Sequence, residues 1–122
     1  MNYYEILPLS NFYLEDSYVL SIIEVAGALI FELEAVLTKS HPQYEEPKKG
    51  EQYCYRKVSL RFFNVDSIEW FDRRFIGFED SAGELDYGNI DSFVVGDGSY
   101  TLSGDWGMVI IRGGGVEAVI TD

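Results

Sequence analysis

The feature that most constrains the fold of this 122-residue chain is the stretch Glu24–Leu37, EVAGALIFELEAVL. Its Ala, Leu and Glu residues favour a helix by intrinsic propensity, but Glu32 and Glu34 are only two positions apart. Two positions span about 200° on a helix, which would turn one carboxylate into the apolar side. On a strand both carboxylates share one face. The opposite face of that strand is then an unbroken apolar series: Leu29, Phe31, Leu33, Ala35 and Leu37.

This region therefore predicts two antiparallel strands, at 18–25 and 28–38. The turn between them falls near Ala26–Gly27, where glycine weakens a helix and suits a turn. The residues before the first strand, Leu14–Ser17, are expected to form a single helical turn or a loop. After the second strand, Lys39–Gly50 contains two prolines and several charges, which predicts an exposed loop.

The segment Gln52–Val65 alternates with a period of two, which predicts a strand with one buried and one wet face. The face predicted to be buried carries Cys54, Val58, Leu60 and Phe62, with Arg56 among them. The face predicted to meet water carries Tyr53, Tyr55, Lys57, Ser59 and Arg61.

Turns and short strands follow in quick succession. We expect a turn at Asn64–Ser67 and a long surface loop over Asp72–Asn89, with one short strand near 75–78. Further strands are expected at 68–71, 90–95, 99–103, 108–112 and 116–121, separated by glycine turns at 96–98, 104–107 and 113–115. Turns spaced about 8–12 residues apart are typical of a β-sandwich or barrel. We predict one all-β domain over 1–122, an antiparallel β-sandwich or half-barrel of about seven to nine strands.

The charge is strongly and unevenly negative, with 21 acidic against 9 basic side chains and a net charge of −12. Residues 1–38 carry acids and no bases, and residues 78–122 carry Arg112 as their single base. Such a field repels nucleic-acid phosphates and anionic lipid headgroups and favours basic proteins. It therefore opposes a nucleic-acid platform built from Tyr53, Tyr55, Lys57 and Arg61. The most apolar stretch, 18–37, contains three glutamates, so no membrane span is expected.

The single cysteine excludes an internal disulfide and a multi-cysteine zinc site. We expect Cys54 to be a buried core residue, because nothing in the spacing brings it to His41 as a nucleophile and base. His41 is expected to be solvated in its loop. The N-terminal stretch Met1–Ser10 has no basic residue and no long apolar run, so no secretory signal is expected. A cytoplasmic protein without a cofactor is the expectation.

The candidate binding residues are Glu79, Asp80, Glu84, Asp86 and Trp106, and no residue is predicted to be catalytic. The four acids could bind a cation through oxygens, although the order of an EF-hand loop is absent; the alternative is a solvated acidic loop. Trp106 lies between two turn glycines and either caps the core or stands exposed as a binding anchor.

Three segments support a resemblance: FYLEDSYVLSI at Phe12–Ile22, GNIDS at Gly88–Ser92, and GDWG at Gly104–Gly107. Together they resemble small all-β bacterial domains, some of which are grouped with immunity proteins of polymorphic toxin systems. The resemblance brings no catalytic residues.

The leading functional hypothesis is a non-enzymatic protein-binding domain, immunity-like, with a basic protein as its partner. The alternative is a small-molecule- or metal-binding domain or a minor enzyme that uses the acidic loop 79–86 with Glu32 or Glu34. A third hypothesis is a homodimer with a structural role.

Overall fold

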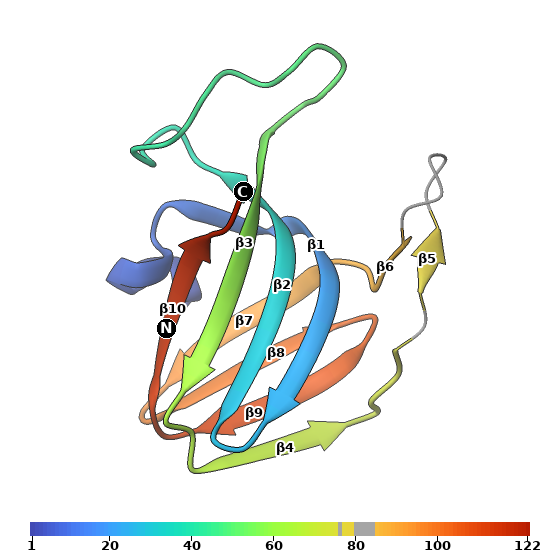
Figure 1. Cartoon of the computed structure of the whole chain (residues 1–122). Helices are drawn as coiled ribbons and strands as arrows, with labels where there is room; N and C mark the ends of the chain where they lie inside the picture. Colours follow the sequence, from blue (N-terminus) through green and yellow to red (C-terminus); the bar gives the residue numbers. More distant parts are fainter. Residues whose placement is uncertain (76, 80–84) are drawn as a thin grey trace.

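The computed structural model describes residues 1–75, 77–79 and 85–122, which form two antiparallel four-stranded sheets packed face to face (Figure 1). The first sheet has the order β1 (Phe12–Val25), β2 (Ala28–Leu37), β3 (Cys54–Phe63) and β10 (Gly115–Ile120). The second has the order β4 (Ser67–Phe71), β9 (Gly107–Arg112), β8 (Ser99–Gly104) and β7 (Ile90–Gly96). The short strands β5 (Phe78–Glu79) and β6 (Leu85–Asp86) pair separately from these two sheets. Two 3-10 turns, η1 (Tyr3–Glu5) and η2 (Leu7–Leu9), precede β1. None of the helices in these ranges is long or apolar enough to cross a membrane.

The all-β prediction is confirmed, and the region that could have been a helix is the hairpin of β1 and β2. Glu32 and Glu34 share the outer face of β2, and neither is buried. The opposite face is buried along its whole length: Leu29, Phe31, Leu33, Ala35 and Leu37. The turn at Ala26–Gly27 is where it was expected, and Gly27 adopts a φ of +75°, which glycine reaches without strain.

The prediction of a helical turn or loop at Leu14–Ser17 is wrong, because β1 begins at Phe12 and continues through these residues. The pairing of β1 with β2 shifts register between Tyr13 and Tyr18. At this irregularity the side chain of Ser17, fully buried, takes part in the backbone network. Its hydroxyl donates to the carbonyl of Tyr13 at 2.8 Å and accepts from the amide of Val36 at 3.0 Å. A polar side chain that satisfies backbone groups lets the strand pass through a bulge without ending.

The segment expected to be one long loop with a strand near 75–78 instead contains the β5–β6 pair. Period-two patterning does not detect strands of two residues, because they are shorter than one alternation. The other strands agree with their predicted positions to within one or two residues, and Lys39–Gly50 is outside all strands, as expected.

The chain passes from one sheet to the other at two short connections, 64–66 between β3 and β4 and 113–114 between β9 and β10. The second connection requires glycine. Gly114 has a φ of +72°, and a Cβ there would lie 2.0 Å from the carbonyl oxygen of Phe63. The sheets are also joined by β1 and the residues before β7, since the amide of Val19 donates to Gly88 and the amide of Tyr87 donates to Val19, both at 2.8 Å. The sandwich is thus partly closed, as in a half-barrel.

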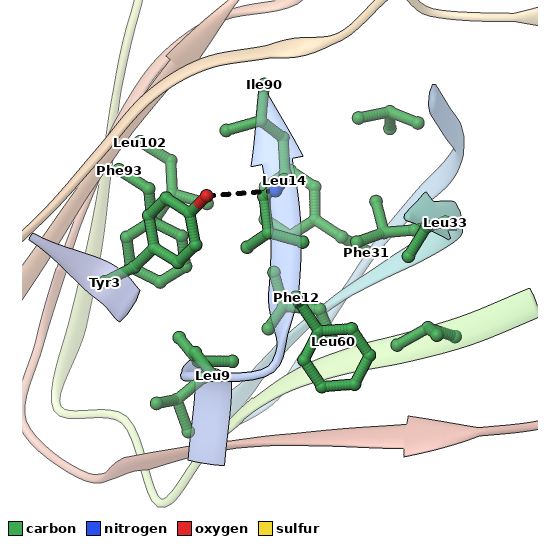
Figure 2. Close-up of a cluster of buried hydrophobic side chains, with 14 of the residues drawn as sticks. Tyr3, Leu9, Phe12, Leu14, Phe31, Leu33, Leu60, Ile90, Phe93 and Leu102 are labelled. Atoms are coloured by element: carbon green, nitrogen blue, oxygen red, sulfur yellow. Dashed lines mark hydrogen bonds between the residues drawn. The ribbon is translucent and has the colours of Figure 1, made fainter. Parts of the chain in front are cut away.

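The core lies between the inner faces of the two sheets, and its largest fully buried side chains are Trp106, Phe31 and Phe62. Cys54 belongs to it, as predicted. Figure 2 shows that the N-terminal turns contribute as well: the ring of Tyr3 lies beside Phe93, with centroids 5.4 Å apart, and its hydroxyl accepts from the amide of Leu14 at 3.0 Å.

Candidate binding face

Trp106 is a core residue, so the alternative of an exposed anchor is wrong. The side chain is fully buried, and its indole N–H donates to the carbonyl of Asn89 at 3.2 Å. Gly104 makes room for the ring, because a Cβ there would lie 2.5 Å from the indole nitrogen. A tryptophan that buries its ring and satisfies its N–H within the protein offers nothing to a partner.

The acidic segment 79–86 is only partly within the described residues. Asp80 and Glu84 lie outside them. Glu79 pairs with Leu85 and Asp86 pairs with Phe78, so Glu79 and Asp86 are not directly opposite each other in the β5–β6 ladder. The carboxylate of Asp86 accepts from the amide of Gly88 at 2.8 Å, which is a local turn bond. Among residues 1–75, 77–79 and 85–122, no three His, Cys, Asp or Glu side chains gather as metal ligands would.

His41 is half-buried, which differs from the expectation of a solvated loop residue. Its ring packs edge-on against Phe12, with centroids 5.2 Å apart, and its Nδ1 accepts from the amide of Gln43 at 3.0 Å. Burial, with a smaller contribution from the positive charge of Arg56, lowers the pKa of His41 below its usual value. The difference arises because the imidazole packs on the apolar ring of Phe12 and is thereby partly removed from water.

The outer face of the β1–β2–β3 sheet carries the pair Glu32 and Glu34, as predicted. Glu32 accepts a hydrogen bond from Ser59 at 3.1 Å, and Arg61 donates to the same hydroxyl at 2.9 Å. Ser59 was expected to meet water but is 1% exposed, because these two longer side chains cover it. Glu34 lies opposite Lys57 in the ladder. The middle of this face is therefore polar, with charges of both signs.

At the end of this face nearest the 39–53 connection, four tyrosines gather: Tyr13 and Tyr18 from β1, Tyr53 just before β3, and Tyr55 in β3. We call them the tyrosine cluster. The rings form a chain of contacts, with centroids 6.1 Å apart for Tyr13 and Tyr53, 6.0 Å for Tyr53 and Tyr55, and 6.1 Å for Tyr55 and Tyr18. Tyr13 and Tyr18 are about 40% exposed.

The tyrosine cluster rests on Val36. In the ladder Val36 stands between Tyr13 on β1 and Tyr55 on β3, and it belongs to the outer face of β2. Although it faces away from the core, it is only 2% exposed. An apolar floor fixes the rings as a packed layer, which distinguishes them from separate tyrosines scattered over a wet surface.

The carboxylate of Asp16 lies among the phenols. Tyr53 donates to it at 2.8 Å, and this hydrogen bond raises the pKa of Tyr53. The negative charge of Asp16 is also the main reason that the pKa of Tyr13 is raised, whereas burial raises the pKa of Tyr55 to about 12. The phenols of Tyr13, Tyr53 and Tyr55 therefore stay protonated at neutral pH, next to a carboxylate.

Sequence reasoning missed this cluster. Tyr53 and Tyr55 were placed on the wet face, but Tyr13 and Tyr18 are five positions apart, and a regular strand would send them to opposite faces. The bulge between them reverses this, so both lie on the outer face with Val36 and Glu34. A register shift of this kind has no reliable signal in the alternation of residues.

A groove of about 290 Å³ adjoins the cluster. Tyr13, Tyr53 and Tyr44 line it together with the last two residues of β2, Val36 and Leu37, and with residues outside that strand: Thr38, Lys39, Gln52 and Cys54. It combines aromatic rings with an apolar floor, which suits the stem of a long side chain.

Comparisons with known proteins found no relative of this chain. No protein-family model matches it, and no match was found among the curated proteins or the solved structures compared with it.

Proposed function

We propose that this chain is a non-enzymatic protein-binding domain whose binding face is the outer face of the β1–β2–β3 sheet. The observation that carries the proposal is the tyrosine cluster, four contacting rings on an outer sheet face. Tyrosine is enriched at protein interfaces because it offers a large amphipathic contact area with only two rotatable angles to immobilise. Strands of a four-stranded sheet carry Tyr13, Tyr18 and Tyr55, and Tyr53 lies one residue before β3.

The rest of the same face also offers exposed apolar side chains to a partner. The polar middle is followed, at the far end of the strands, by the exposed apolar side chains of Ile23, Val25 and Phe63. An isolated exposed apolar side chain is ordinary, whereas contiguous ones mark interaction surfaces. A partner that covered this face would bury apolar surface at both ends of the strands. The charges in the middle would then fix the orientation in which the partner binds.

The charge supports a basic partner. Residues 1–38, which include both β1 and β2, carry six acids and no base, and the whole chain carries −12. Opposite charge on a partner raises the rate of encounter well above that of neutral surfaces. The resemblance to immunity-protein domains makes a toxin of basic surface the first partner to be tried.

The test begins with the immobilised chain and extract of its native cell, and continues with the purified partner that is identified. Affinity is then measured for the wild type, Tyr18→Ser and the control Val94→Ser, which removes an exposed apolar side chain from β7 in the other sheet. We expect Tyr18→Ser to weaken binding by about tenfold or more, the effect of removing an aromatic anchor. Val94→Ser should bind as the wild type does. Loss of binding in Val94→Ser alone would place the interface on the other sheet and contradict the proposal.

A further inference from the structure

Two kinds of group make the electrostatic potential at the tyrosine cluster negative. Ring faces are negative because of their π electrons, and the carboxylate of Asp16, which accepts from Tyr53, adds negative charge among them. Tyr13 and Tyr53 meet nearly edge to face, with an interplanar angle of 85°, and Tyr53 and Tyr55 meet at 82°. Because neighbouring rings are nearly perpendicular, the ring faces of the cluster point in more than one direction around the carboxylate of Asp16.

Elsewhere the chain supplies its own cation to an aromatic pair, half-buried Trp70 and exposed Phe75. The guanidinium of Arg73 lies 5.0 Å from the ring centre of Trp70 and 4.7 Å from that of Phe75. The tyrosine cluster differs. Within the described part of the chain no lysine or arginine lies over its rings, and none forms an ion pair with Asp16. The tyrosine rings and the Asp16 carboxylate are thus brought together as in a cation-binding site. Among the described residues, no cationic side chain lies over these rings or pairs with Asp16.

The groove beside the cluster provides the approach. Its volume is about 290 Å³, and Tyr13 and Tyr53 belong to both the cluster and the groove. The apolar end of β2 can take an aliphatic stem, while the rings and Asp16 take a charged end. Lys39 also lines the groove, so an entering cation must keep its charge on the side of Asp16.

We propose that the tyrosine cluster and Asp16 bind the guanidinium group of an arginine side chain of the partner protein, an inference that rests on the proposed function. Guanidinium fits better than ammonium for two reasons. It is planar and less strongly hydrated, so it stacks on aromatic rings. It also donates several N–H bonds in one plane and can engage a carboxylate that already accepts from Tyr53.

The test uses small probes on the full chain, with ring-labelled tyrosines observed by NMR. The probes are N-acetyl-arginine amide, its neutral analogue N-acetyl-citrulline amide, and N-acetyl-lysine amide. We expect the arginine probe to shift the resonances of the four cluster tyrosines saturably and to leave Tyr100, which packs on Phe62 in the core, unchanged. Citrulline should produce no saturable shift, and lysine should bind several-fold more weakly than arginine.

Two variants of equal charge separate the carboxylate from the overall field. Asp16→Asn keeps an oxygen that can accept from Tyr53 but removes the charge, and we expect it to weaken the arginine probe about fivefold to tenfold. Asp91→Asn removes an exposed charge from β7 and should bind the probe as the wild type does.

Three results would overturn this inference. Equal shifts with citrulline would make the cluster a stacking surface for neutral groups, and equal binding of lysine would remove the guanidinium preference. Shifts that depend on protein concentration alone, with a dimer in sedimentation, would assign the face to a second copy of this chain. All three are read without the natural partner, so the failure of this inference is distinguishable from a failure of the proposed function, which is decided by the affinity of Tyr18→Ser.

Discussion

Trp106 is the largest fully buried side chain among the described residues. Its ring contacts Phe31 at 5.2 Å and Trp70 at 6.1 Å between centroids, and its N–H serves the carbonyl of Asn89. We predict that Trp106→Phe lowers the free energy of unfolding by about 2–4 kcal/mol, because it leaves a void and removes the donor. Urea unfolding followed by far-UV circular dichroism measures the loss.

The matched control for this prediction is Trp70→Phe. Trp70 is only half-buried, and its indole donates to Glu24 at 2.7 Å near the surface. Its replacement should cost less than about 1 kcal/mol. Equal losses for the two variants would show that Trp106 has no special role in the core.

Tyr3 makes the stability of the chain sensitive to alkaline pH. Burial, reinforced by the hydrogen bond from its hydroxyl to Glu15, raises the pKa of Tyr3 well above its usual value. The unfolded chain therefore releases this proton near pH 10 while the folded chain retains it. The contribution to stability is complete below about pH 10 and is lost as the pH rises towards the pKa of the folded state.

We predict that the free energy of unfolding of the wild type falls between pH 10 and 11, and that Tyr3→Phe makes this fall shallower by up to about 1.4 kcal/mol per pH unit. Tyr55, whose pKa is about 12, leaves a residual slope in both proteins. Urea unfolding at each pH from 8 to 11 provides the slopes. Tyr4→Phe, at an exposed neighbour, is the control and should match the wild type; an unchanged slope in Tyr3→Phe would contradict the prediction.

At the residue scale the sequence predicted Cys54 and the inner face of β2 well, since each follows from alternation and from apolar character. It did not predict the burial of Tyr3, because a tyrosine outside any strand carries no periodic signal. It also misjudged Ser59, whose burial depends on the two longer side chains that cover it. Contacts between side chains distant in sequence decide both cases.

Among the elements, β1 depends on Ser17 at its bulge. The hydroxyl accepts from the buried amide of Val36 and donates to the carbonyl of Tyr13. We predict that Ser17→Ala lowers the free energy of unfolding by about 1–3 kcal/mol, because a buried amide loses its acceptor. Ser21→Ala, later in the same strand and half-buried, should change it by less than about 0.5 kcal/mol. Chemical denaturation of the two variants side by side checks this, and equal effects would rule out the bulge as the reason.

The same element explains which part of the candidate site could be predicted. The wet face of β3, with Tyr53 and Tyr55, follows from alternation. The contribution of β1 does not, because regular alternation separates Tyr13 from Tyr18, and Leu14–Ser17 reads as polar and turn-like. The acidic loop was a candidate because of its composition, and Trp106 because glycines flank it. Both features indicate turns, but neither shows which side chain faces a partner.

For the whole molecule, the connection 113–114 decides how the two sheets meet. Gly114 and Gly98 have nearly the same φ, +72° and +71°, but a Cβ at Gly98 meets nothing within 4 Å. We predict that Gly98→Ala costs about 1–2 kcal/mol for the left-handed backbone alone. Gly114→Ala should cost at least about 1 kcal/mol more, because its Cβ would collide with the carbonyl of Phe63. Thermal and urea unfolding measure both, and equal costs would show that the connection has slack.

The order of the strands also has a kinetic consequence. Most neighbouring strands of the two four-stranded sheets are consecutive in the sequence, and within the described residues only β3–β10 and β4–β9 pair in these sheets across a long stretch of chain. Because β3 leads directly into β4 and β9 directly into β10, the pairing of β4 with β9 leaves β3 and β10 already close together. The entropy of closing one long loop is thus incurred once for two pairings. We expect both to form in a single slow step that limits folding, after the hairpins, at the millisecond-to-second rates usual for all-β chains.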